Sequence, residues 1–354
     1  MSARISALVR PRIASLSPYS SARDDFTGTA HVFLDANENA LGSVGSTLCN
    51  RYPDPHQRKL KATLGTLRGI SPERIFFGNG SDEVIDLLFR VFCEPEKDQV
   101  LLTPPTYGMY SVAAAINAVS VVEVPLTGTF QLDLDGLKRA ANPRSKLLIL
   151  CSPNNPTANL LHRDSIVDVL SWFPGIVAVD EAYGDFAPEG SVVPLLEEFE
   201  QLVVIQTFSK AWGLAGARAG VAFAHEFIVS TLDKVKPPYN MNSLTQELLL
   251  TALDNVAKKD LFVRELLAER ERLAKELAHL PFVRRVYPSD ANFLLVETTD
   301  PKAIYSTLLE AGIVVRDRSN LTGLGGCLRI TVGTPDENSA LLSALQRIAQ
   351  EETQ

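Results

Sequence analysis

Between residues 75 and 235, short apolar runs alternate with stretches in which apolar positions recur every three or four residues. The runs consist almost entirely of Val, Ile, Leu and Ala, which is typical of strands covered on both faces. Their alternation with helical stretches predicts βαβ units and a mostly parallel sheet of an α/β protein. Strands are expected at residues 99–103, 119–124, 146–151, 176–180, 202–206 and 219–224. Helices are expected at residues 82–92, 133–141, 164–172, 243–253 and 257–280.

The pattern changes after Pro281. Shorter apolar runs alternate there with two helical stretches, which predicts a smaller α+β domain. We therefore expect an N-terminal arm that joins the small domain (1–40), a large domain (41–280) and a small C-terminal domain (281–354). The small domain's expected strands are 283–287, 292–296, 313–316 and 327–332, and its expected helices are 301–311 and 335–349.

Composition narrows the classes of function. The net charge of −8 argues against a nucleic-acid partner, because binding phosphates needs a basic face. No apolar run approaches the roughly 18 residues of a membrane span. The four cysteines and five histidines are scattered along the chain, so no metal site is expected. The absence of cysteine pairs in the sequence also suits a reducing, cytoplasmic compartment. The arginine- and serine-rich first 23 residues weakly resemble an organelle transit peptide, and an ordinary arm is the favoured interpretation.

Polar side chains follow three consecutive expected strands. Asn155 comes after the first of them, Asp180 and Tyr183 end and follow the second, and Lys210 follows the third. Each alone has a structural explanation as a turn or a helix cap. Because ligands bind beyond the carboxyl ends of strands in open α/β sheets, together they predict one cleft.

The residue types in this cleft match the needs of pyridoxal 5′-phosphate. Lys210 is suited to form a Schiff base with its aldehyde. Asp180 would stabilise a protonated ring nitrogen, and Asn155 and Tyr183 would donate to the phenolic oxygen. Tyr107 would stack on the ring. The phosphate would lie at a helix N-terminus among hydroxyls and a guanidinium. The candidates for this role are Gly80, Ser81, Asp82, Thr207, Ser209 and Arg218.

An ordered set of motifs along nearly the whole chain resembles fold-type I pyridoxal-phosphate aminotransferases and, within them, the histidinol-phosphate aminotransferases. The resemblance implies a mostly parallel seven-stranded sheet between helices, a homodimer with shared active sites, and Lys210 as the catalytic lysine. It also implies that Tyr52 reaches the partner's cofactor phosphate. The motifs are residues 18–23, 34–39, 50–54, 78–83, 105–110, 152–157, 180–183, 207–218 and 327–334.

The resemblance also implies a substrate site. Arg329 holds the position that binds an anionic group, and Tyr19 and Arg316 resemble residues near a substrate phosphate. Two departures are Ala158, where the family usually has glycine, and Ala40, where it often has proline. Alanine in a glycine's left-handed conformation would be strained, so a different local turn is expected.

The implied reaction transfers the amino group of histidinol phosphate to 2-oxoglutarate, giving imidazole-acetol phosphate and glutamate in histidine biosynthesis. The alternatives are an aromatic amino-acid aminotransferase, a threonine-phosphate decarboxylase, or a catalytically silent protein that only binds the cofactor. The arginines favour a phosphate-bearing substrate over an aromatic one. The retention of Lys210, Asp180, Tyr183 and Asn155 disfavours catalytic silence.

Overall fold

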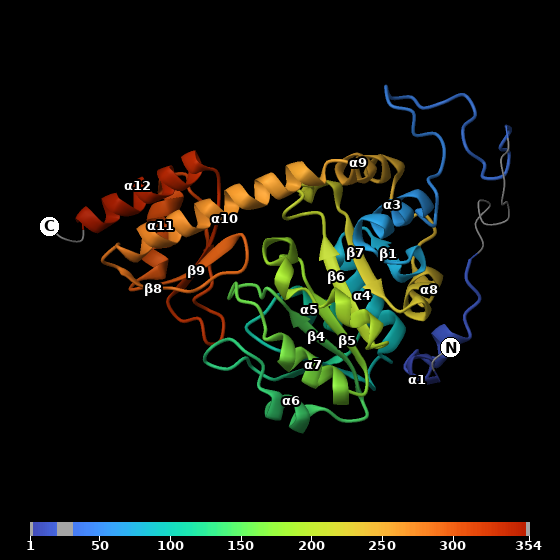
Figure 1. Ribbon diagram of the computed structural model, residues 1–354, viewed down its shortest axis with the longest axis horizontal. Coiled ribbons are helices and arrows are strands. Elements are labelled where there is room, and N and C mark those ends of the chain that lie inside the picture. Colours follow the sequence, from blue (N-terminus) through green and yellow to red (C-terminus); the bar gives the residue numbers. More distant parts are fainter. Residues whose placement is uncertain (1–2, 20–30, 352–354) are drawn as a thin grey trace.

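A seven-stranded sheet in the order β1-β7-β6-β5-β4-β2-β3 forms the centre of the larger domain in the computed structural model, which describes residues 3–19 and 31–351 (Figure 1). Only β7 runs antiparallel to its neighbours, so the expected mostly parallel sheet is confirmed. The strands are β1 (Ile75–Gly78), β2 (Gln99–Leu102), β3 (Ser120–Glu123), β4 (Ser145–Cys151), β5 (Ile176–Asp180), β6 (Leu202–Thr207) and β7 (Gly220–Ala224).

Helices cover both faces of this sheet, because successive side chains of each strand point to opposite sides. In β4, Leu147 and Ile149 pack under one set of helices, whereas Leu148 and Leu150 pack under the other. The first set is α4 (Ser81–Phe92), α5 (Met109–Ile116) and α8 (Glu226–Val235). The second set is α3 (Arg58–Arg68), α6 (Leu134–Ala140), α7 (Arg163–Trp172) and α9 (Ser243–Leu253). Short 3-10 helices lie at Pro72–Arg74, Gly184–Phe186, Pro188–Gly190, Val193–Glu197 and Ala215–Ala217.

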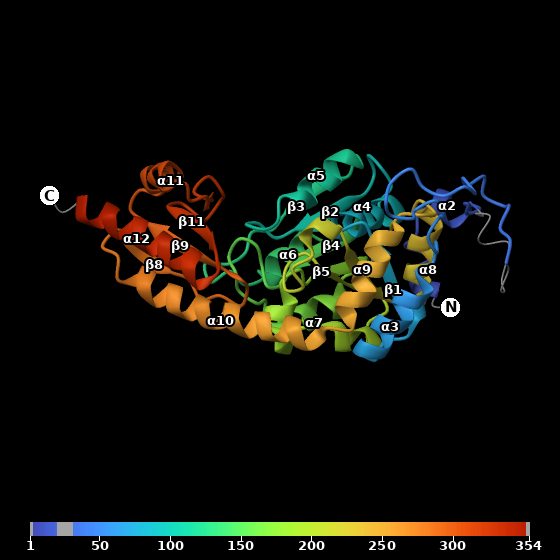
Figure 2. The same ribbon diagram turned by 90° about the horizontal axis from the view of Figure 1, so that it is seen from above.

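The long helix α10 (Val256–Ala278) leads to a second, smaller sheet (Figures 1 and 2). This sheet has the order β10-β11-β9-β8 and is antiparallel throughout. The expected α+β character of this part of the chain is thus confirmed. Its elements are β8 (Val283–Val286), β9 (Phe293–Thr298), α11 (Pro301–Glu310), β10 (Arg316–Asp317), β11 (Cys327–Thr331) and α12 (Pro335–Glu351).

The N-terminal segment contacts the large domain in this chain, where the sequence led us to expect contact with the small one. It contains the short helices α1 (Ala3–Ser6) and α2 (Pro11–Ala14). Ile5 and Val9 are buried in the core cluster beneath α4 and α8, which accounts for this position. The boundaries at residues 40 and 280 stay predictions. None of the helices in the described ranges is long and apolar enough to cross a membrane.

Candidate active site

The polar residues that follow β4, β5 and β6 meet in one cavity of about 290 Å³. Twelve of the predicted site residues line it, and four further lining residues were not predicted. The predicted ones are Ser81, Asp82, Tyr107, Asn155, Asp180, Tyr183, Thr207, Ser209, Lys210, Arg218, Arg316 and Arg329. The others are Cys151, Ala182, Ala215 and Arg318.

Lys210 lies in the loop between β6 and β7. Its Nζ lies 5.6 Å from the centroid of the Tyr183 ring. Burial, and then the positive charge of Arg329, lower the pKa of Lys210. A lowered pKa increases the neutral fraction of the amine, which is the form that acts as a nucleophile or a base. The loop is anchored by Trp212, whose indole N–H donates to Asp185 at 3.1 Å.

Asp180 ends β5 and is buried at the floor of the cavity. The Tyr110 hydroxyl donates to its Oδ2 at 2.6 Å, and the Ala182 backbone N–H donates to its Oδ1 at 3.0 Å. Burial raises the pKa of Asp180 to about 6, although these two donors oppose that rise. A buried carboxylate of this kind is suited to stabilise a cationic ring nitrogen placed beside it.

Tyr110 was not predicted as a site residue, and its hydrogen bond yields a test. In Tyr110→Phe, loss of one donor to the carboxylate should raise the pKa of Asp180 from about 6 to about 7. Carboxyl NMR titration of the cofactor-free protein measures this value. Tyr107→Phe is the matched control, because the Tyr107 hydroxyl donates to Asp82 at 3.3 Å. An unchanged pKa in Tyr110→Phe would contradict the assignment.

Arg329, Asn155 and Tyr183 form a chain of side chains across the cavity. Arg329 Nη1 donates to Asn155 Oδ1 at 2.6 Å, and Asn155 Nδ2 donates to the Tyr183 hydroxyl oxygen at 3.4 Å. Burial raises the pKa of Tyr183, so this hydroxyl stays protonated and keeps a hydrogen to donate. The small sheet supplies Arg329, and the large domain supplies the other two residues.

The predicted phosphate cradle combines a helix start with nearby hydroxyls. Helix α4 begins at Ser81 without a side-chain cap, so its first N–H groups are available to an anion. Thr207 Oγ1 donates to Ser209 Oγ at 3.0 Å. Gly80 has φ +85°, and a Cβ there would lie 2.8 Å from Arg218 Nη2. Glycine at this position therefore lets the guanidinium approach the helix start.

Of three further predictions, the one for Ala158 is wrong, and those for Tyr19 and Tyr52 stay predictions. The expected change of turn at Ala158 is wrong, because Ala158 keeps the left-handed conformation with φ 67° and packs with Tyr183 and Ala211. Tyr19 is exposed and does not line the cavity, and the rest of its motif, 20–23, lies outside the described residues. Tyr52 also lies away from the cavity and stacks on Tyr239 at a centroid distance of 4.3 Å.

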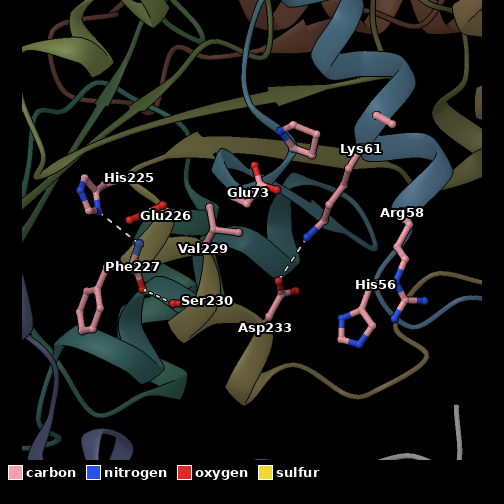
Figure 3. A pocket seen from close by; sticks show the side chains of 12 residues that line it. His56, Arg58, Lys61, Glu73, His225, Glu226, Phe227, Val229, Ser230 and Asp233 are labelled. Atoms are coloured by element: carbon pink, nitrogen blue, oxygen red, sulfur yellow. Dashed lines mark hydrogen bonds and ion pairs between the residues drawn. The ribbon is translucent and has the colours of Figure 1, made fainter. Parts of the chain in front are cut away.

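A larger cavity, of about 780 Å³, lies between α3 and α8 (Figure 3). Figure 3 shows Lys61 reaching from α3 toward Asp233 of α8, where their charged atoms are 3.2 Å apart. Arg58 forms an ion pair with Asp54 at 2.9 Å. These cations are already paired within the protein, so volume alone does not make this cavity the reactive one. The amine of Lys210, which forms no ion pair within the described residues, and the buried carboxylate of Asp180 lie in the smaller cavity.

Comparisons with known proteins agree with this geometry. The family model "Aminotransferase class I and II" matches residues 25–345. A protein of Cytophaga hutchinsonii named histidinol-phosphate aminotransferase is 52% identical over 346 residues, which cover 98% of this chain and 99% of the relative. The crystal structure of the histidinol-phosphate aminotransferase from Clostridium acetobutylicum superposes with a TM-score of 0.80 at 24% identity, over 86% of this chain and 92% of the other.

The shared fold does not separate related chemistries. The L-threonine-O-3-phosphate decarboxylase from Porphyromonas gingivalis has a TM-score of 0.74 at 24% identity, over 85% of this chain and 91% of the other. At this identity the likeness extends to the fold alone. Function therefore has to be argued from the side chains of the site.

Proposed function

The chain belongs to the class I and II aminotransferases, and from that premise we propose that it transfers the amino group of histidinol phosphate to 2-oxoglutarate. The products are imidazole-acetol phosphate and glutamate, in histidine biosynthesis. The observation that carries this proposal is the cavity that joins an amine, a buried carboxylate and four arginines, three of which come from the C-terminal part of the chain. The 52% identity with a relative of that name supports the choice of substrate.

Pyridoxal 5′-phosphate is the cofactor, and the residues of the cavity fit it. Ser81 at the α4 N-terminus, Ser209 and Arg218 would hold its phosphate, and all three line the cavity. Asp180 would lie beside the ring nitrogen, and Tyr107 forms part of the wall. When bound, the cofactor supplies an aldehyde that reacts with amines and a ring that withdraws electrons.

The chain's own residues then have separate tasks. Lys210 would remove a proton from the amine-bearing carbon of the substrate, acting as base, and would then deliver it to the carbon C4′ of the cofactor, acting as acid. Its lowered pKa makes the neutral, proton-accepting form available. Asp180 supplies a negative charge at the cavity floor, which would stabilise the positive charge of a protonated ring nitrogen. Asn155 and Tyr183 would donate hydrogen bonds to the phenolic oxygen of the cofactor. Arg329 would bind the anionic group of the substrate.

The experiment is a substrate screen on the purified protein loaded with cofactor. Histidinol phosphate should convert the visible absorption band of the bound cofactor, and 2-oxoglutarate should restore it. Phenylalanine and threonine phosphate, tested in parallel, should react at least tenfold more slowly. Efficient transamination of phenylalanine without reaction of histidinol phosphate, or release of carbon dioxide from threonine phosphate, would refute the proposal.

We also propose that two copies of this chain form a dimer with shared sites. Tyr52 is 51% exposed and lies beside a segment rich in exposed apolar side chains, including Leu34, Leu41 and Val44. Large exposed apolar patches mark interaction surfaces. In the dimer, Tyr52 would reach the cofactor phosphate of the partner subunit.

We further propose a cytoplasmic location for this protein. The four free cysteines support this location, and cell fractionation tests it.

Mixing two inactive or weakened variants tests the shared site. Lys210→Ala and Tyr52→Ala should each be impaired as homodimers. A mixed dimer contains one site in which Lys210 and Tyr52 are both intact, so activity should rise after subunit exchange. Sedimentation as a monomer, or mixed dimers without recovered activity, would contradict the proposal.

A further inference from the structure

Three arginines gather at the small-sheet end of the cavity. Arg316 in β10 lies opposite Arg329 in β11 in the antiparallel register. Arg318 continues from β10, and its backbone N–H donates to Cys327 O at 2.9 Å. Within residues 3–19 and 31–351, no carboxylate lies within ion-pair distance of these three guanidinium groups. The cluster therefore combines three positive charges, none of which forms an ion pair within the described ranges, although the neighbouring Asp317 partly offsets the charge of Arg318.

Arg318 differs from its two neighbours in how its donors are used. Its Nε is buried and has no hydrogen-bond partner in the part of the chain that the structure describes. Arg329 donates to Asn155, and Arg316 is exposed to solvent. An arginine held for packing gives its donors to the protein, as Arg270 does in donating to Ala291 O at 2.8 Å. Arg318 has no such partner, although burying an unsatisfied donor is costly.

The charge of the cluster identifies the chemical class that would satisfy it. Guanidinium groups bind carboxylates and phosphates through paired hydrogen bonds. One carboxylate offers a single negative charge and two oxygens, which Arg329 can match. A phosphate monoester offers about two negative charges and three oxygens. Three arginines therefore match a phosphate better than a carboxylate.

We propose that Arg318 is a specificity-determining residue that favours a phosphate-bearing amino substrate over an amino acid with only carboxylates. This inference rests on the proposed function, because it assigns Arg318 to the phosphate of that reaction's substrate. Both half-reactions use the same cavity, but only histidinol phosphate brings a phosphate into it. Arg318 is therefore expected to contribute to the half-reaction with histidinol phosphate and to contribute little to the half-reaction with glutamate.

The two half-reactions supply an internal comparison. In Arg318→Gln, the concentration of histidinol phosphate that gives half the maximal single-turnover rate should rise about 10- to 100-fold, since a charge-assisted hydrogen bond is lost. The corresponding value for glutamate should change less than about threefold by the same reasoning. Arg318→Lys should recover part of the phosphate preference. Arg284→Gln, at an exposed position in β8, is the matched control and should leave both values unchanged.

Stability separates a binding role from a packing role. Arg318→Gln removes a buried donor without a partner, so its melting temperature should equal or exceed that of the wild type. A lower melting temperature together with equal losses in both half-reactions would assign Arg318 to packing and overturn the inference. Unchanged kinetics in both half-reactions would overturn it as well.

A binding measurement keeps this inference distinct from the proposed function. Calorimetry should show that the holoenzyme binds inorganic phosphate about tenfold more tightly than Arg318→Gln does. Equal affinities would overturn the inference even if histidinol phosphate proves to be the substrate. A tenfold difference in an enzyme that does not react with histidinol phosphate would support the inference and refute the proposed function.

Discussion

Replacing Lys210 with alanine should reduce turnover by a factor of about 10⁴ or more, because the variant loses both its nucleophilic amine and its proton carrier. The cofactor should still bind, since Ser81, Ser209 and Arg218 are untouched. Single-turnover kinetics and equilibrium dialysis of the cofactor measure the two effects separately. A large loss of turnover with retained binding is the expected result.

Two controls sharpen this experiment. Lys210→Arg keeps a positive charge at the position but cannot release its proton near neutral pH, so it should be as inactive as alanine. Lys97→Ala, at an exposed position outside the cavity, should be fully active. Turnover close to the wild-type rate in Lys210→Ala would remove the lysine from its assigned role.

Replacing Asp180 with asparagine should have the second-largest effect. The substitution keeps the shape of the side chain but removes the negative charge to which the Tyr110 hydroxyl donates. Turnover should fall by about 10²- to 10³-fold, which is typical for the loss of a preorganised electrostatic group. Asp135→Asn, at an exposed position in α6, is the control and should retain full activity. Asp180→Asn with a rate within threefold of the wild type would contradict the role.

The same variant should change how stability depends on pH in the cofactor-free protein. An aspartate in the unfolded chain has a pKa of about 3.9, whereas burial raises that of Asp180 to about 6. Between these values the folded state binds more protons, so its stability decreases as pH rises from about 4 to about 6. Above that range the loss is complete and amounts to about 3 kcal/mol. Urea unfolding at pH 4 and pH 7 should show this decrease in the wild type and a smaller one in Asp180→Asn.

Most strands of the large sheet could be predicted from apolar runs in the sequence, because buried strands need stretches without polar residues. Strand β1 was missed for the same physical reason. Ile75–Gly78 is only four residues long, starts after a charged residue and ends in glycine. Its place is set by antiparallel pairing with β7, which is a tertiary contact. A short run of this kind does not distinguish a strand from a loop.

The site was predictable where the chemistry lies directly at strand ends. Asp180 ends β5 and Lys210 follows β6, so the topology of a parallel sheet brings them together. Tyr110 lies within helix α5, where an aromatic residue in an apolar stretch indicates packing; only the fold reveals its contact with Asp180. Arg318 follows Arg316 and Asp317, a pattern typical of a solvated charged run. The roles of Tyr19 and Tyr52 remain predictions, because neither lines the cavity in a single chain.

The two sheets divide the site between them. The amine and the carboxylate belong to the large sheet domain, whereas Arg316 and Arg329 come from the small one. A change of residue in β10 or β11 can therefore alter which anion is accepted without displacing the groups that move protons. For a gene under selection, this separation means that substitutions at Arg316 can change substrate preference with little effect on the proton carrier, whereas substitutions at Arg329 also affect Lys210, whose pKa is lowered by burial and by the charge of Arg329. New activities would then arise by substitutions in the last quarter of the chain, while the earlier part is retained.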